Sequence, residues 1–325
     1  MSSGSNALPT GFSLLGGLPQ RIPDLPVSIV FVLAYALLTP LAYWRIARRR
    51  TRLAILIRPC IVLLVRIATY IIRALQASGK ATSTGLFIAE QVLLLLGIIP
   101  LCEPLVSLTR YHIRRNWIPT FEDPEEGRPA SGTDRLLKLL EYLLFAAVII
   151  GATAGGLVGN ALDNPDQLPT LRRLRYATYG LTLAVIIGGP LLATLSTISL
   201  GLPRRPVVFL YACALCLGLA TCYRIEVSVH PVSPISHGAK AGFYLLNSLP
   251  ELVCTAFYLA VDLDALFDVN EGVWKEKVEK RMKKGRWVGP YRAKGEEAPS
   301  ATDLVEMVPP QTELPSYSTE SPGKA

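Results

Sequence analysis

The chain has 325 residues, half of them hydrophobic, with a formal net charge of +8 and a mean hydropathy of +0.36. A soluble domain of this size does not need so much apolar sequence, and long apolar blocks are typical of membrane-spanning segments. The positive charge does not indicate nucleic-acid binding, because Lys and Arg lie mainly at block ends and in one tail cluster, as expected beside anionic lipids. The sequence therefore predicts an all-α polytopic membrane protein in contact with membrane lipids.

The chain begins with a polar stretch, residues 1–25, that is rich in Gly, Ser and Pro. It lacks the basic region with which a cleaved signal peptide starts. We predict that it forms a disordered extracytoplasmic amino terminus.

Seven apolar blocks follow, each about 20 residues long and so able to cross a bilayer as a helix. They cover residues 27–46, 53–75, 84–108, 136–159, 175–200, 206–225 and 241–263. We predict a seven-helix transmembrane domain over residues 26–266.

Glycine and proline predict local features of these helices. The fourth block holds Gly151, Gly155 and Gly159 at four-residue spacing, which favours close approach of a neighbouring helix, with simple flexibility as the alternative. Prolines predict kinks in the third, fifth and seventh blocks, at Pro100, Pro104, Pro190 and Pro250.

Basic residues predict the orientation. The loops after the first, third and fifth blocks carry twelve Lys or Arg residues, against six on the opposite side. Because cytoplasmic loops are enriched in Lys and Arg, we predict an external amino terminus and a cytoplasmic carboxyl terminus. The membrane is predicted to be the plasma membrane or another endomembrane.

The predicted cytoplasmic tail, residues 267–325, starts with a basic stretch. Residues 272–287 have a local charge of +5, and Trp274, Val278 and Met282 follow one another at about one helical turn. This pattern predicts an amphipathic helix on the inner leaflet, with a solvated charged helix as the alternative. Residues beyond 295 are rich in Pro, Ser, Thr and Glu and are predicted to be disordered.

A short motif near the end of the tail suggests a partner. Leu314, Pro315 and Tyr317 are similar to a Leu-Pro-x-Tyr ligand of WW domains. We predict recruitment of a WW-domain ubiquitin ligase, with a chance match in a solvated tail as the alternative.

The second and third blocks carry polar side chains inside otherwise apolar sequence. The second has three arginines and the third has two glutamates and a glutamine, namely Arg58, Arg66, Arg73, Glu90, Gln91 and Glu103. A charge in hydrocarbon normally faces a partner or a wet cavity, so we predict an intramembrane polar seam. Counting 1.5 Å per residue matches Arg58 with Glu103 and puts Glu90 between the levels of Arg66 and Arg73. We predict that Arg66 faces the bundle, with Glu90 as its acidic partner. The seam either fixes helix register through buried ion pairs or forms a polar path or head-group site.

A second candidate polar site combines the sixth and seventh blocks. It consists of Arg224, Glu226, Asn247 and Glu251. Glu251 lies near the middle of its block, where a carboxyl group must be paired or protonated.

Motifs for catalysis or metal binding are not found. The sequence has no G-x-S-x-G, H-E-x-x-H or P-loop. Cys213 and Cys216 have no second cysteine pair to complete a zinc site, and Asp262 with Asp264 is a weak match to a sugar-transfer D-x-D. We predict no catalytic residues, no metal and no cofactor.

Several stretches together resemble a known group of proteins. Residues 63–75, 88–111, 222–229 and 244–253, with the glycine-rich fourth block, are similar to a fungal family of seven-helix integral membrane proteins of uncharacterised function. More distantly, the chain resembles the fungal lipid-translocating exporter family linked to aminocholesterol resistance. That similarity lies in the Tyr-x-x-Arg of Tyr70 and Arg73 and in the Arg-x-Glu of Arg224 and Glu226.

These observations lead to three classes of function. The leading prediction is an integral membrane protein that handles or senses a lipid or other hydrophobic molecule. The alternatives are a seven-helix receptor-like signalling protein and a membrane-embedded enzyme. A lipid-flip assay distinguishes the first class from the other two.

Overall fold

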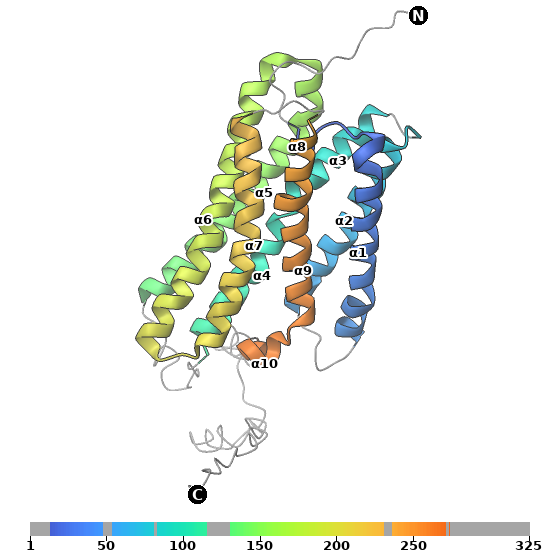
Figure 1. Cartoon of the computed structure of the whole chain (residues 1–325). Helices are drawn as coiled ribbons and strands as arrows, with labels where there is room; N and C mark the ends of the chain where they lie inside the picture. The colour runs from blue at the N-terminus through green and yellow to red at the C-terminus, as the bar shows by residue number, and fades with distance from the viewer. Residues whose placement is uncertain are drawn as a thin grey trace, which may run out of the picture. The chain divides into compact units, whose positions relative to one another are not determined.

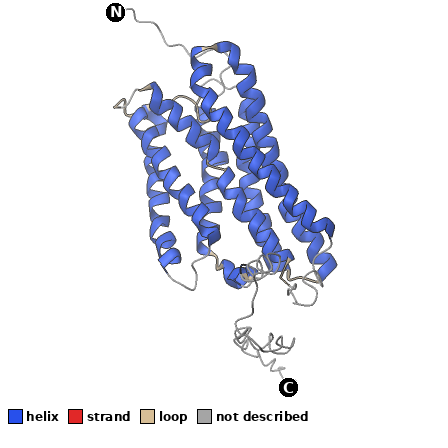
Figure 2. Cartoon of the chain, turned by 180° about the vertical axis from the view of Figure 1, so that it is seen from behind, coloured by secondary structure: helices blue, strands red, loops and turns tan. Residues whose placement is uncertain are grey.

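The structure is a computed structural model, and it describes residues 14–47, 54–80, 83–115, 131–230, 236–270 and 273. These residues are helical with short connections and contain no strand (Figures 1 and 2). Contacts divide the chain into two units, and the first comprises residues 1–116 and 129–272. The predicted tail helix from residue 272 and the WW-ligand segment lie outside the described residues, apart from residue 273.

Seven helical stretches in the described part of the chain are long and apolar enough to cross a membrane, which confirms the predicted fold class. They are Arg21–Ala47, Ile57–Ala77, Thr84–Ile113, Gly132–Leu162, Pro165–Leu200, Arg204–Val229 and His237–Ala260. Most extend past the predicted limits because hydropathy detects only the apolar part, whereas helical hydrogen bonding continues through polar ends.

Several of these stretches combine more than one element. The elements are α1 (Arg21–Ala47), η2 (Ala54–Leu56), α2 (Ile57–Ala77), α3 (Thr84–Leu96), α4 (Ile99–Ile113), α5 (Ser131–Asp163), η3 (Pro165–Gln167), α6 (Leu168–Leu200), α7 (Arg204–Val229), α8 (His237–Gly242), η4 (Phe243–Ser248, a π-helix), α9 (Leu249–Ala260) and α10 (Leu263–Phe267). Successive spans alternate in direction, so the start of α1 and α8 share one end while α10 lies at the other (Figure 1).

The packing of the bundle places α4 in its middle. This helix contacts α2, α5, α6 and α7, and its side chains Leu101, Leu105 and Leu108 are completely buried. Large apolar side chains such as Leu37 and Leu215 are instead exposed on the outside. An apolar exterior with charged groups inside suits a bundle whose surroundings are lipid.

The glycines of α5 allow α3 to approach closely. A Cβ atom added at Gly155 would lie 3.3 Å from Val92, and one added at Gly159 would lie 3.3 Å from Ile88. The predicted contact face of small residues is therefore confirmed for two of its three glycines.

Two irregular segments interrupt the spans, and each ends just before a proline at which a kink was predicted. The third span breaks at Gly97 and Ile98, and Pro100 then occupies the first turn of α4, where a missing N–H group costs nothing. Pro250 likewise lies in the first turn of α9, directly after the π-helix η4. The helix α6 runs without interruption through Pro190.

The predicted disorder of residues 1–25 is wrong for its second half. Leu14 and Leu15 are buried, and α1 begins at Arg21. The backbone N–H of Leu15 donates to the side chain of Gln91, and the Gln91 amide donates back to the Leu15 carbonyl, both at 3.3 Å. Long-range contacts order this polar stretch. Residues 1–13 lie outside the described part.

Ion pairs gather at the end of the bundle that carries α10. Arg115 pairs with Asp268 at 2.6 Å and Arg114 with Asp134 at 3.0 Å. Arg45 donates to the carbonyl of Leu259 at 3.1 Å. These arginines belong to the loops predicted to be cytoplasmic. The orientation of the bundle in the membrane stays a prediction.

Candidate functional site

The interior of the bundle holds two clusters of charged side chains. Among the described residues, seven Asp, Glu, Lys or Arg side chains have no exposed surface. The Asp24 cluster consists of Asp24, Arg73, Glu90, Lys240 and Tyr244. The Glu251 cluster consists of Arg66, Arg224, Asn247 and Glu251.

The Asp24 cluster is centred on Arg73 of α2. Its Nη1 atom donates to Glu90 of α3 at 2.5 Å, its Nη2 to Asp24 of α1 at 3.0 Å, and its Nε to the Tyr244 hydroxyl at 3.0 Å. Lys240 of α8 forms an ion pair with the second oxygen of Asp24. Two cations therefore face two carboxylates, and the cluster is formally neutral.

The segment of residues 14–20 closes over the Asp24 cluster. Arg73 also donates to the Gly16 carbonyl, and Lys240 donates to the Leu18 carbonyl at 2.9 Å. Gly16 has a φ of 81°, and a Cβ atom there would lie 3.0 Å from the guanidinium nitrogens of Arg73. Only glycine combines this backbone conformation with such a close approach.

The Glu251 cluster joins α2, α7, η4 and α9. Arg224 donates through Nη2 to Glu251 at 2.5 Å and through Nε to the Asn247 side-chain oxygen at 2.7 Å. Arg66 forms an ion pair with the other oxygen of Glu251. The two arginines share one carboxylate, so the cluster carries one formal positive charge in excess.

Both irregular helical segments meet the Glu251 cluster. A Cβ atom at Gly97 would lie 2.6 Å from Cζ of Arg66, so the guanidinium lies against the backbone at the break between α3 and α4. The carbonyl of Leu95 accepts from Arg224 at 3.0 Å, and Asn247 belongs to the π-helix. Irregular backbone within a membrane span is tolerated where protein groups or water satisfy it.

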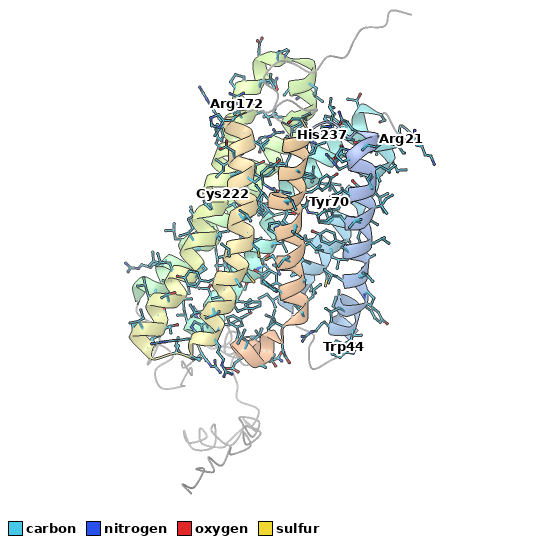
Figure 3. All side chains as sticks on the ribbon, viewed as in Figure 1. Arg21, Trp44, Tyr70, Arg172, Cys222 and His237 are labelled. Atoms are coloured by element: carbon cyan, nitrogen blue, oxygen red, sulfur yellow. The ribbon has the colours of Figure 1, made fainter. Side chains whose placement is uncertain are left out.

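A stack of aromatic rings, Phe31, Tyr35, Tyr70 and Tyr244, connects the two clusters. Ring centroids are 5.0 Å apart for Phe31 and Tyr70, 6.0 Å for Tyr35 and Tyr70, and 5.7 Å for Phe31 and Tyr244. Tyr244 belongs to the Asp24 cluster, while Tyr70 lies one helical turn after Arg66 on α2. Tyr70 lies between the end marked by Arg21 and the end marked by Trp44 (Figure 3).

The predicted pairing of Arg66 with Glu90 is wrong. Arg73 pairs with Glu90, and Arg66 pairs with Glu251. Arg66 and Arg73 are seven residues apart, which separates them by about 10 Å along the helix, so one glutamate cannot serve both. Arg66 therefore joins the group that was predicted to be a separate site.

The other four candidate residues belong to neither cluster. The Glu226 side chain is 67% exposed and contacts His230 at 2.9 Å, because a two-residue step turns it about 200° from Arg224. Arg58 and Glu103 form the predicted pair, but at the bundle surface, with side chains 41% and 35% exposed. Gln91 binds the backbone of Leu15.

Sequence reasoning missed Asp24, Lys240 and Tyr244. Asp24 and Lys240 stand at the ends of apolar blocks, where charges are ordinary, and only the fold brings them together. The D-x-D residues have local roles, since Asp262 caps α10 and Asp264 accepts from the backbone of Asn270 at 2.8 Å. The part of the chain that the structure describes has no group of three or more His, Cys, Asp or Glu that could hold a metal ion.

Comparisons of the chain with family models, with curated proteins and with solved structures find no match.

Proposed function

We propose that this multi-pass membrane protein binds a lipid or another hydrophobic molecule whose polar group enters the Glu251 cluster. The observation that carries the proposal is a set of buried polar atoms with no hydrogen-bond partner among the described residues. They include Nε of Arg66, Nδ2 of Asn247 and the hydroxyl of Tyr35. Each such atom costs about 1–3 kcal/mol, and buried polar groups are normally satisfied.

The location of these atoms favours a ligand that partitions into the bilayer. Arg66 lies near the middle of α2, and Glu251 lies within the seventh span. Ionisable groups at such depth are expensive, and they commonly mark binding sites or transport paths. A ligand with an apolar chain and a polar head matches an apolar exterior around a polar interior.

The irregular backbone supports the same proposal. The break between α3 and α4 and the π-helix η4 both contact the Glu251 cluster. Discontinuous helices form substrate sites in many transporters, and π-helical segments often occur at functional sites. The resemblance to lipid-translocating exporters points to the same class of ligand and stays a prediction.

Lipid analysis of the purified protein tests this proposal. The full chain is purified in a mild detergent, and the bound lipids are identified by native mass spectrometry. We expect a bound lipid in the wild type and its loss from Asn247→Leu, whereas Arg58→Gln, on the same helix as Arg66 but at the surface, keeps it. A wild-type lipid content equal to that of Asn247→Leu contradicts the proposal.

A second assay separates binding from transport. The protein is reconstituted into liposomes, and the movement of a labelled lipid between leaflets is measured. Lipid movement above that of protein-free liposomes assigns transport. Lipid binding without movement, together with ligand-dependent recruitment of a cytosolic partner, assigns the receptor-like alternative.

A further inference from the structure

We infer that the Glu251 cluster binds an oxyanion, a phosphate or a carboxylate, carried by an amphipathic lipid. This inference rests on the proposed function and specifies its ligand class. Four observations carry it: the charge of the cluster, the type of its unpartnered atoms, the nearby start of α4, and the way the Asp24 cluster satisfies its own cations.

The charge of the cluster calls for one more anion. Among the described residues, Glu251 is the only carboxylate within ion-pair distance of Arg66 or Arg224. The buried carboxylates of Asp24 and Glu90 are engaged by Arg73 and Lys240. A bound oxyanion makes the cluster neutral, whereas a quaternary ammonium head group would raise its charge further.

The unpartnered atoms are of the right kind. Nε of Arg66 and Nδ2 of Asn247 can only donate, and the Tyr35 hydroxyl can donate as well. The Asn247 oxygen already accepts from Arg224, which fixes the direction in which the amide presents its donor. The planar guanidinium group matches the paired oxygens of carboxylates and phosphates.

The start of a helix adds to the positive potential. α4, 15 residues long, begins at Ile99, directly after the break at which Arg66 lies against Gly97. The amino-terminal end of a helix carries a partial positive charge that favours anions. This contribution only reinforces the charge excess of the two arginines.

The Asp24 cluster shows how this chain satisfies spare donors on buried cations. There, the carbonyl oxygens of Gly16 and Leu18 accept from Arg73 and Lys240. In the Glu251 cluster, the Leu93 carbonyl accepts from Arg66 and the Leu95 carbonyl accepts from Arg224. Nε of Arg66 has no acceptor among the described residues. An oxygen of the ligand would take the corresponding place.

Thermal unfolding of the full chain in nonionic detergent tests the inference. The probes are oleate, dioleoyl phosphatidic acid, the uncharged lipid monoolein and inorganic phosphate. We expect the two anionic lipids to raise Tm by roughly 5 °C when they are present at about 100 times their Kd, and monoolein to have no such effect.

A substitution that supplies the missing charge locates the effect. Asn247→Asp places a carboxylate beside Arg224 without changing side-chain size. We expect a higher Tm without lipid and loss of the shift caused by anionic lipid. Arg66→Gln removes the excess charge instead and should also abolish the shift, so it replaces Asn247→Asp if that variant fails to fold. Arg58→Gln, which removes a surface charge from the same helix, should keep the shift.

The possible outcomes separate the inference from the proposed function. An equal shift with monoolein overturns the oxyanion and leaves lipid binding intact. No shift with any lipid, together with no copurified lipid, overturns both. A shift with inorganic phosphate alone assigns the site to a free anion and overturns the lipid source. An unchanged shift in Asn247→Asp and Arg66→Gln removes the ligand from this cluster.

Discussion

The Asp24 cluster and the Glu251 cluster share helix α2 and the π-helix η4 but differ in charge. Arg66 and Arg73 are seven residues apart on one face of α2. Arg73 is the centre of the Asp24 cluster, and Arg66 belongs to the Glu251 cluster. In the Asp24 cluster, two cations face two carboxylates, and a backbone segment covers them. In the Glu251 cluster, two arginines share one carboxylate, and donors remain without partners.

The difference suggests two roles for buried charge in one protein. A neutral network that ties α1, α2, α3 and α8 to the segment before α1 fixes how these elements pack, which is an architectural role. A network with an excess charge is expensive in hydrocarbon, so a bound ligand explains it better than an architectural role does. Variants of the two clusters should therefore behave differently.

The largest effect is expected from Glu251→Gln. This change leaves Arg66 and Arg224 buried without a counter-ion, and breaking a buried pair costs about 3–5 kcal/mol. We expect a large fall in Tm or in the yield of folded protein, measured by fluorescence-detected size exclusion. Asn247→Asp in the same chain returns a carboxylate to Arg224 and should restore much of the loss. A Glu251→Gln protein as stable as the wild type contradicts the pairing.

The two arginines of α2 provide a direct contrast. Arg73→Gln leaves Asp24 and Glu90 with only Lys240 nearby, so we expect a loss of about 3–5 kcal/mol. Arg66→Gln leaves Arg224 paired with Glu251 and removes the excess charge, so its cost should be clearly smaller. Thermal unfolding of both variants under the same conditions gives the comparison. Equal destabilisation by the two variants would mean that the Glu251 cluster, like the Asp24 cluster, mainly fixes how the helices pack.

The seven spans could be predicted from the sequence because backbone N–H and C=O groups in lipid must form their hydrogen bonds within helices. Apolar blocks of sufficient length therefore mark the position of each spanning helix. It also identified Arg66, Arg224, Asn247 and Glu251, because polar groups inside such blocks are conspicuous. It assigned them to two separate sites, because counting along a helix gives depth but not the identity of the neighbouring helix.

Other features could not be found from local patterns. The order of residues 14–20 comes from Arg73, Gln91 and Lys240, which are far away in sequence, whereas their composition alone is typical of disorder. The break at Gly97 precedes Pro100, because the proline fits the first turn of a new helix and the Arg66 guanidinium occupies the space beside the glycine.

A smaller effect is expected from Gly16→Ala, which tests how residues 14–20 cover the Asp24 cluster. Alanine at this position would keep a positive φ, which costs a residue with a Cβ atom about 1–2 kcal/mol. Its Cβ atom would also press on the side chains of Arg73 and Phe243. Gly79→Ala is the matched control, since Gly79 has a φ of 75° and open space around it. We expect Gly16→Ala to lower Tm more than Gly79→Ala. Equal shifts would show that only the backbone conformation matters and that the contact with Arg73 is easily relieved.

The smallest effect is expected from Arg58→Gln, which breaks an ion pair that belongs to neither cluster. The side chains of Arg58 and Glu103 are 41% and 35% exposed, so each can reach water or lipid head groups when its partner is lost. Exposed ion pairs contribute about 0–1 kcal/mol to the free energy of unfolding, so we expect only a small change in Tm. Glu103→Gln should behave in the same way, and the double variant should show little coupling between the two positions. If Arg58→Gln instead destabilised the protein as much as Arg73→Gln, burial would not be what separates the clusters from the surface. A surface ion pair would then not serve as the baseline against which the neutral Asp24 cluster and the positively charged Glu251 cluster are compared.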